Sequence, residues 1–231
     1  MRIIAENISK RYFRKSGDAN YFLAVQPLDL ELRGGETAVL MGRSGSGKTT
    51  LLNMLCGLLA PSEGSVRIDG TDLYALNDKA LSRLRGERIG IVPQGRSAID
   101  TLTVLENILL PAQLYGWPLP EKSARQWMEH LAIGSLADAR PAELSGGELR
   151  RMAIVRALAQ RPDFLFADEP TGDLDDENTA LVLSALRDYA HEQGKSVFIV
   201  SHESDALRYA DRAFRMDSGQ LESFPVPNAL L

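Results

Sequence analysis

The sequence has a single cysteine, Cys56, so an internal disulfide is impossible and a reducing compartment is the simpler expectation. It has no apolar run of about 18 residues, the length that a membrane-spanning helix needs. It also has no N-terminal segment in which charged residues precede an apolar stretch, the pattern of a secretory signal. We therefore expect no direct insertion into a membrane, and any membrane association should come through a partner.

Basic residues are not in excess, because 26 Lys and Arg stand against 31 Asp and Glu, for a formal net charge of -5. Nucleic-acid binders usually carry a basic surplus, so this balance argues against nucleic acid as a partner. The 231 residues, 44% hydrophobic and 25% charged, suit one large globular α/β domain, or a core with a subdomain.

Four short apolar runs, separated by longer segments with helical spacing, predict a mostly parallel, doubly wound α/β sheet. The runs are AVLM (38–41), RIGIV (88–92), DFLFA (163–167) and SVFIV (196–200). They are followed by the polar residues Gly42, Gln94, Asp168 and His202. Because ligands of such sheets collect at the carboxyl ends of the strands, these four residues are candidates for one site.

The remaining segments predict the domain organisation. Alternating residues up to about position 32, and in SVRIDG (65–70), predict antiparallel strands beside the main sheet. TVLENILLPAQLYG and EKSARQWMEHLAI predict helices interrupted at 116–120. We expect a single domain over 1–231, with a core at 1–96 and 161–222, a helical subdomain at 97–160 and a loosely held tail at 223–231. RKSGDAN (14–20) predicts a loop.

The segment GRSGSGKT (42–49) follows an apolar run, precedes a helical pattern and fits the phosphate-binding pattern G-x-x-x-x-G-K-[ST]. Its glycines let backbone N–H groups point at phosphate, Lys48 can reach the β- and γ-phosphates, and the Thr49 hydroxyl can ligate Mg²⁺. The sequence therefore predicts binding of ATP or GTP. The candidate nucleotide-binding residues here are Gly42, Arg43, Ser44, Gly45, Ser46, Gly47, Lys48, Thr49 and Thr50.

Two adjacent acids follow the buried run in DFLFADEP. Asp168 is suited to hold Mg²⁺ through water, and Glu169 is suited to polarise an attacking water as a general base. The alternative is a solvated turn. We favour the metal and phosphate interpretation because such a site requires an acid near the phosphate loop.

A second possible anion site is LSGGE (144–148), in which Ser145, Gly146 and Gly147 precede a helical pattern. The hydroxyl, the accessible backbone N–H groups and the positive end of the helix dipole can all bind phosphate. An ordinary helix start capped by Ser145 is the alternative.

The unbroken block LSGGELRRMAIVRALAQRPDFLFADEP, downstream of GRSGSGKT, resembles the ATP-binding cassette (ABC) ATPases. The resemblance extends from IIAENISKRY to DRAFRMDSGQL. It implies a P-loop NTPase core of the ABC type, with a mostly parallel sheet, an antiparallel β subdomain and a helical subdomain. It also implies that Ser145, Gly146 and Gly147 contact the γ-phosphate of a nucleotide held by the opposite subunit. Glu148, in the same signature, is a further candidate nucleotide-binding residue.

Three further positions are similar to functional residues of that family. Gln94 resembles the glutamine that approaches Mg²⁺ and the attacking water, and the segment after it faces the membrane partner. His202 resembles the switch histidine that contacts the γ-phosphate. Asp175 closes EPTGDLD, which resembles the loop that runs along the dimer interface.

Tyr12, in ISKRYF, resembles the aromatic residue on which adenine stacks. Base stacking on an aromatic ring is worth about 1–3 kcal/mol in nucleic-acid systems. Phe13, Tyr21 and Phe22 compete with it for this role. A place in the core is the alternative, because an aromatic residue in an amphipathic strand is commonly buried there.

The resemblance implies an ATPase that works as a homodimer, with each nucleotide between the Lys48 loop of one chain and the Ser145 loop of the other. Mg²⁺ would be the cofactor and separate integral membrane permease subunits the partners. The location would be cytoplasmic, peripheral to the inner membrane through the permease.

Within the family, MGRSGSGKTTLLNMLCGL, TVLENILLPAQLYG and EPTGDLD look most like the lipoprotein-releasing and macrolide-export (type VII, mechanotransmission) group. The sequence departs from that group at Asp173, where Asn is usual, and at Leu149 and Arg150, which replace a common pair of glutamines. We interpret Arg150, Arg151 and Arg156 as a solvated helix face rather than a nucleic-acid contact, since the chain is acidic. Contact with nucleotide or with neighbouring acids is the alternative.

The alternatives are the ATPase subunit of an importer or of a cell-division complex, and a nucleic-acid-clamping ABC protein. Proteins of the last class usually carry two cassettes or a long coiled-coil insertion, and this sequence shows neither. A small-molecule P-loop kinase would leave LSGGE and His202 without a role. The substrate, the direction of transport, the permease and any accessory protein stay open.

Overall fold

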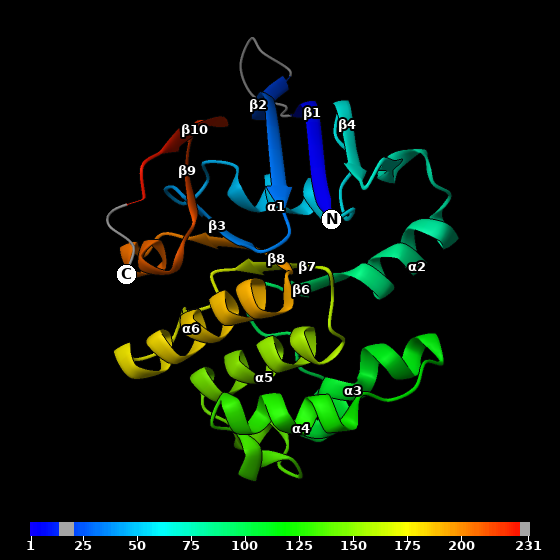
Figure 1. Ribbon diagram of the computed structural model, residues 1–231, viewed down its shortest axis with the longest axis vertical. Coiled ribbons are helices and arrows are strands. Elements are labelled where there is room, and N and C mark those ends of the chain that lie inside the picture. The colour runs from blue at the N-terminus through cyan, green and yellow to red at the C-terminus, as the bar shows by residue number, and fades with distance from the viewer. Residues whose placement is uncertain (14–20, 227–231) are drawn as a thin grey trace.

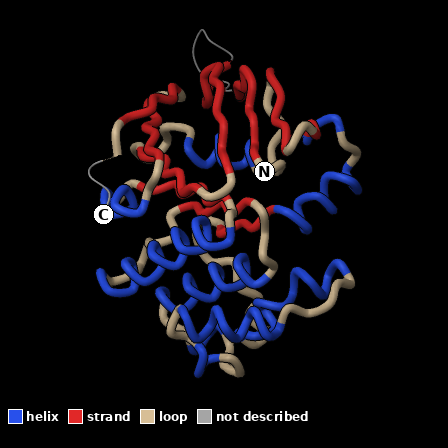
Figure 2. Tube along the Cα trace, viewed as in Figure 1, coloured by secondary structure: helices blue, strands red, loops and turns tan. Residues whose placement is uncertain are grey.

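The fold is built on a six-stranded sheet in the computed structural model, which describes residues 1–13 and 21–226 (Figures 1 and 2). Its neighbouring strands are parallel, except for the final antiparallel hairpin. The four predicted apolar runs form β3, β6, β7 and β8, so the prediction of a mostly parallel sheet is confirmed. In the order β10-β9-β3-β8-β7-β6, the strands are β3 (Glu36–Met41), β6 (Ile89–Val92), β7 (Phe164–Asp168), β8 (Ser196–Ser201), β9 (Arg212–Asp217) and β10 (Gln220–Phe224).

An antiparallel four-stranded sheet lies at the top of the molecule as drawn in Figure 1. It consists of β1 (Arg2–Phe13), β2 (Tyr21–Arg33), β4 (Glu63–Ile68) and β5 (Thr71–Asp72), in the order β2-β1-β4-β5. Alternate side chains of β1, such as Ile3 and Ala5, are buried, because one face of the sheet packs on the core. The predicted antiparallel strands are therefore present. The predicted loop at 14–20, between β1 and β2, lies outside the described residues.

The helices in the described part of the chain gather mainly below the large sheet (Figure 1). Helix α3 begins with a capping box between Thr103 and Glu106 and ends at Gly116, in the left-handed conformation. The predicted interruption thus separates α3 from α4. The α-helices are α1 (Lys48–Leu55), α2 (Asp78–Arg88), α3 (Val104–Tyr115), α4 (Glu121–His130), α5 (Gly146–Ala159) and α6 (Asp176–Gln193), and the 3₁₀ helices are Leu73–Ala75, Gly134–Leu136, Pro141–Glu143 and Ser204–Tyr209. Within residues 1–13 and 21–226, no helix combines the length and the apolar character needed to cross a lipid bilayer.

The apolar core lies on both faces of the large sheet. Alternate residues of its strands point to opposite faces, so Phe166 and Phe198 join the cluster beneath α1 and the antiparallel sheet, whereas Leu165 and Val197 join the cluster formed with α3 to α6. Because both faces are covered, every residue of β7 and β8 is buried, and all but their terminal Asp168, Ser196 and Ser201 are apolar. The second cluster includes Ile154 of α5, so it continues from the sheet into the segment 97–160. The division at 97–160 stays a prediction.

The C-terminal hairpin extends beyond the predicted start of the tail. Ser223 pairs with Phe214, and Phe224 pairs with Ala213, so both residues belong to β10. The Arg215 guanidinium lies 5.2 Å from the centre of the Phe224 ring. Residues 227–231 of the predicted tail lie outside the described residues.

The basic residues of α5 do not form a solvated face. Arg150 and Arg151 are each only 8% exposed, and Arg156 is half-buried, so the sequence interpretation is wrong. Arg150 donates from Nη1 to the Pro93 carbonyl oxygen at 2.8 Å, and Arg151 donates to the side-chain oxygen of Asn178. Helical spacing alone could not reveal these acceptors, because they lie far away in the sequence.

Candidate active site

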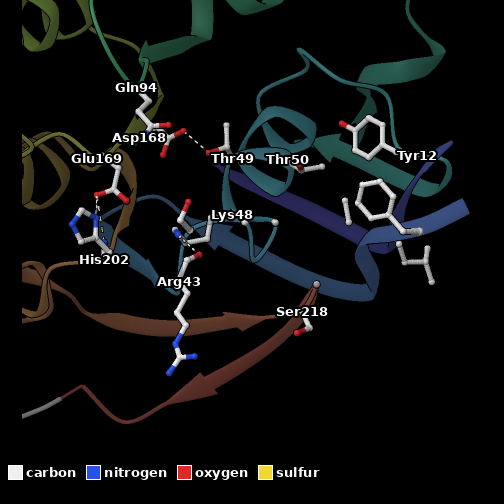
Figure 3. Close-up of a pocket in the computed structure, with 17 residues that line it drawn as sticks. Tyr12, Arg43, Lys48, Thr49, Thr50, Gln94, Asp168, Glu169, His202 and Ser218 are labelled. Carbon is white, nitrogen blue, oxygen red and sulfur yellow. Dashed lines mark hydrogen bonds and ion pairs between the residues drawn. The ribbon is translucent and has the colours of Figure 1, made fainter. Parts of the chain in front are cut away.

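A cavity of about 900 Å³ opens at the carboxyl ends of β3, β7 and β8 (Figure 3). It is formed by the phosphate loop, the ends of the parallel strands, and parts of β1, β2 and the β9–β10 turn. This position is the one in which open α/β sheets bind ligands. Its lining consists of Tyr12, Phe22, Leu23, Ala24, Arg43, Ser44, Gly45, Gly47, Lys48, Thr49, Thr50, Gln94, Asp168, Glu169, His202, Ser218 and Gly219.

The phosphate loop joins β3 to α1 with its glycine backbone closely packed. Gly47 has φ +108° and precedes α1, and a Cβ atom there would lie 2.2 Å from the Ala24 carbonyl oxygen. Only glycine fits that position. Gly42 and Ser46 of the predicted set do not line the cavity, and Ser46 is 6% exposed.

Lys48 crosses the loop instead of pairing with an acid. Its Nζ atom donates to the carbonyl oxygens of Gly42 at 2.7 Å and Arg43 at 2.9 Å (Figure 3). The side chain is 7% exposed, so these carbonyls replace the water that a buried ammonium group loses. The first N–H groups of α1 have no intrahelical acceptor, so the cationic side chain and the helix N-terminus together favour an anion at this end of the cavity.

Asp168 and Thr49 meet in the same cavity. The Thr49 hydroxyl donates to Asp168 Oδ2 at 2.8 Å, and Asp168 is 3% exposed. Burial raises the pKa of Asp168 above its ordinary value, and the adjacent Glu169 raises it further, against the hydrogen bond from Thr49 and the charge of Lys48. Gln94 also lines the cavity, beside Asp168 in Figure 3.

Glu169 and His202 lie next to each other on one wall of the cavity (Figure 3). The Oε2 atom of Glu169 lies 2.8 Å from Nδ1 of His202 and accepts the backbone N–H of that residue at 3.4 Å. Glu169 has φ +52°, an uncommon left-handed conformation for this residue type, and its backbone N–H donates to the Val200 carbonyl oxygen. The hydrogen bond and charge of Glu169 raise the pKa of His202 above its ordinary value.

The structure separates the four aromatic residues that the sequence left in competition. Tyr12 and Phe22 line the cavity with stacked rings, 5.8 Å between centres and 29° between planes. Phe13 and Tyr21 contact each other edge to face and do not line it. The pair Tyr12 and Phe22 therefore offers the aromatic surface at this end.

The β9–β10 turn supplies lining residues that sequence reasoning missed, Ser218 and Gly219. Gly219 donates its N–H to the Ser46 carbonyl oxygen at 3.0 Å and accepts from the backbone N–H of Gln26 at 2.8 Å. The Ser-Gly pair signals a turn, but nothing in the sequence places that turn beside the phosphate loop. Leu23 and Ala24 were missed for the same reason.

The signature residues do not reach this cavity. Ser145 caps α5: its Oγ atom accepts from the backbone N–H of Glu148 at 3.3 Å, while Glu148 Oε2 accepts from the N–H and the hydroxyl of Ser145, both at 2.7 Å. Ser145 and Gly146 are exposed. Asp175 similarly caps α6, accepting from the backbone N–H of Asn178. None of the residues at 144–148, nor Asp175, lines the cavity.

Comparisons with known proteins agree with this architecture. A family model described as ABC transporter matches residues 25–172. The chain is 40% identical over 223 residues to the Uncharacterized ABC transporter ATP-binding protein YbbA of Escherichia coli K12, covering 94% of this chain and 98% of that protein. It is 38% identical over 196 residues to the lipoprotein-releasing system ATP-binding protein LolD of Pseudomonas fluorescens, covering 84% and 86%.

A solved structure shows the same fold. The dimeric post-hydrolysis structure of the ATP-binding cassette MJ0796, bound to ADP and Pi, superimposes with a TM-score of 0.87 at 33% identity, covering 96% of this chain and 98% of that one. The arrangement of the two sheets and the helices is thus that of an ATP-binding cassette.

Replacing Glu169 by Gln is expected to lower the pKa of His202, because it removes the charge that favours the imidazolium. In the parent protein the pair stabilises the fold fully below the ordinary histidine pKa of about 6.5, and this stabilisation is lost as the pH rises through the raised value. An NMR titration of the ring protons measures the shift, with a His202→Asn spectrum identifying the resonance among the three histidines. Equal pKa values in parent and variant would contradict the pairing.

Proposed function

This chain belongs to the ABC transporter family as an ATP-binding, ATP-hydrolysing subunit, and we propose that two copies close around ATP to drive a separate membrane permease. One observation carries the proposal. The cavity gathers an aromatic pair, a phosphate loop, two acids and a histidine, whereas the signature loop of the same chain lies outside it, with Ser145 and Gly146 exposed. A second copy is the source of a signature loop that completes the site.

Nucleotide binding uses the two ends of the cavity. The stacked pair of Tyr12 and Phe22 supports adenine, with Tyr12 as the predicted stacking residue. The phosphate loop and the N-terminus of α1 hold the phosphates. Lys48 exchanges its two carbonyl acceptors for phosphate oxygens, which supply the charge that those carbonyls lack.

Mg²⁺ fits the oxygen groups at the centre of the cavity. The Thr49 hydroxyl and the Asp168 carboxylate are already 2.8 Å apart, and Gln94 lines the same space. Magnesium is usually held by one or two carboxylates together with substrate phosphates and water. A dense group of protein ligands is therefore unnecessary, and no cluster of three His, Cys, Asp or Glu residues occurs in the described ranges. When bound, the ion supplies neutralisation of phosphate charge.

Hydrolysis assigns different tasks to the neighbouring polar residues. Glu169 accepts a proton from the attacking water, Gln94 orients that water, and His202 places a cationic group beside the γ-phosphate. The hydrogen bond between Glu169 and His202 supports these roles, because it holds both side chains at one wall of the cavity. The protein's main contribution is to position groups and to neutralise charge.

Assembly uses the exposed N-terminus of α5. Its Ser145, Gly146 and Gly147 offer a hydroxyl and backbone N–H groups at the positive end of a 14-residue helix. Glu148 completes the capping box of this helix, and Asp175 caps α6. In the closed pair these residues would face the nucleotide held by the other subunit.

The partner that uses this motion is proposed to be an integral membrane permease, with the ATPase peripheral to the inner membrane. The relatives named as lipoprotein-releasing ATP-binding proteins support a member of the lipoprotein-release and macrolide-export group. The departures at Asp173, Leu149 and Arg150 line a small cavity beside the signature and do not line the nucleotide cavity.

Glu169→Gln is expected to retain ATP binding, to lower kcat by at least about 100-fold and to trap an ATP-bound dimer, because it removes the base but leaves the phosphate loop intact. Phosphate release measures turnover, and size-exclusion chromatography with ATP and Mg²⁺ measures the dimer. A variant that hydrolyses ATP at the parent rate would refute the assignment of the base.

Ser145→Arg is expected to leave nucleotide binding by the monomer within about twofold of the parent, because Ser145 lies outside the cavity, while blocking dimer closure by bulk and charge. Titration of the dilute variant with fluorescent ATP measures nucleotide binding by the monomer. Size-exclusion chromatography of Ser145→Arg combined with Glu169→Gln measures dimer closure. Loss of binding in the monomer would show that the signature loop serves its own nucleotide.

Affinity purification of the native protein from membranes, in mild detergent, is expected to recover a permease with a large extracytoplasmic domain. Mass spectrometry identifies that subunit, and added permease-containing membranes should alter the ATPase rate. Recovery of an importer permease or a cell-division permease instead would support the alternative transporters, and recovery of nucleic acid without a permease would contradict membrane transport.

A further inference from the structure

The loop that carries Gln94 is attached to the signature helix by two arginines. Arg150 donates from Nη1 to the carbonyl oxygen of Pro93 at 2.8 Å, immediately before Gln94. Arg156 donates to the Ser97 carbonyl oxygen at 2.8 Å and to its hydroxyl at 2.5 Å. Both arginines lie on α5, whose N-terminus is the signature loop. The exposed residues 94–96 are thus held at both ends by one helix.

Arg150 is buried between the Gln94 loop, the signature loop and the loop before α6. It is 8% exposed, and a buried guanidinium requires compensation by polar contacts. Its Nη2 atom lies 3.8 Å from the position that a Cβ atom on Gly172 would occupy, so the side chain also borders the loop before α6. Along with Gly146 and Asp173, it lines a cavity of about 90 Å³ between the Gln94 loop and the signature loop.

The hydrogen bond from Arg150 to Pro93 connects elements that belong to two different nucleotide sites of the proposed dimer. Ser145 and Gly146 lie one turn before Arg150 on the same helix, and in the closed dimer they would touch the nucleotide of the other subunit. Gln94 lines the cavity of this subunit's own nucleotide. A displacement of α5 on closure would therefore move the backbone that carries Gln94, because Arg150 is enclosed and its hydrogen bond joins the helix to the Pro93 carbonyl.

We propose that Arg150 is a positioning residue that makes the placement of Gln94 in one nucleotide site depend on docking of the signature loop in the other. The inference rests on the proposed ATP-driven dimer and adds to it a residue through which the two sites communicate. Arg150 does not line the nucleotide cavity, so its effect passes through the Pro93 carbonyl.

A double-mutant cycle on kcat tests this role. Arg150→Gln removes the guanidinium from Pro93 and is expected to lower kcat about 10- to 100-fold, the scale on which small misplacements act. ATP binding by the monomer should stay within about twofold of the parent. In a Gln94→Ala background the same substitution should have little further effect, because the residue that it positions is already gone. Arg150→Lys, which keeps a cationic donor, should restore part of kcat.

Arg151→Gln is the matched control, since Arg151 is equally buried on the same helix but donates to Asn178. Any decrease that it causes should be the same factor in the parent and in the Gln94→Ala background. If Arg150→Gln does not fold, as judged by thermal unfolding, Arg150→Met is carried through the same cycle, because an apolar side chain of similar length fills the space.

The inference is overturned if the Arg150 variant keeps the parent kcat. It is also overturned if Arg150→Gln lowers kcat by the same factor in the parent and in the Gln94→Ala background. These results are distinct from failure of the proposed function. A parent protein that neither hydrolyses ATP nor dimerises would refute the ATP-driven dimer, whereas an active parent with multiplicative effects would refute only the role of Arg150.

Discussion

The parallel pairing of β3, β8 and β7 is the constraint on which the site depends. Met41 pairs with Ser201 and Asp168 with Val200, so the carboxyl ends of three strands from distant parts of the chain meet at one edge. The phosphate loop, the two acids and His202 follow directly from those ends. Because parallel neighbours require long crossovers, the segments between the strands are free to carry the helices that cover both faces.

The sequence predicts this edge well, because its signals are local. A buried parallel strand reads as an apolar run, and a phosphate loop needs glycines at fixed spacing, so AVLM followed by GRSGSGKT identifies both together. The aromatic end is different. The β1–β2 register pairs Tyr12 with Phe22 and Phe13 with Tyr21, and successive residues of a strand face opposite sides. That register, which no local signal encodes, places one pair in the cavity.

Arg150 marks the limit of sequence reasoning more sharply. A run of arginines on a helix normally indicates a solvated face. Whether such a group is buried depends on an acceptor elsewhere, and here the acceptor is the backbone carbonyl of Pro93, 57 positions away. Every residue type carries a backbone carbonyl, so this acceptor cannot be recognised from composition or charge pattern. The contact of Gly219 with Ser46, in which the acceptor is likewise a backbone carbonyl, cannot be recognised in this way either.

The signature loop is ordered by hydrogen bonds within the single chain. Ser145 and Glu148 satisfy each other through three hydrogen bonds, which fix the first turn of α5 and the direction of its dipole. In the proposed dimer, a loop ordered in advance would lose less conformational entropy on association, so more of its interaction with phosphate would be available for closure. The same order extends through Arg150 to the Gln94 loop. The order of the exposed loop and, by the proposed role of Arg150, the placement of Gln94 would therefore both depend on α5.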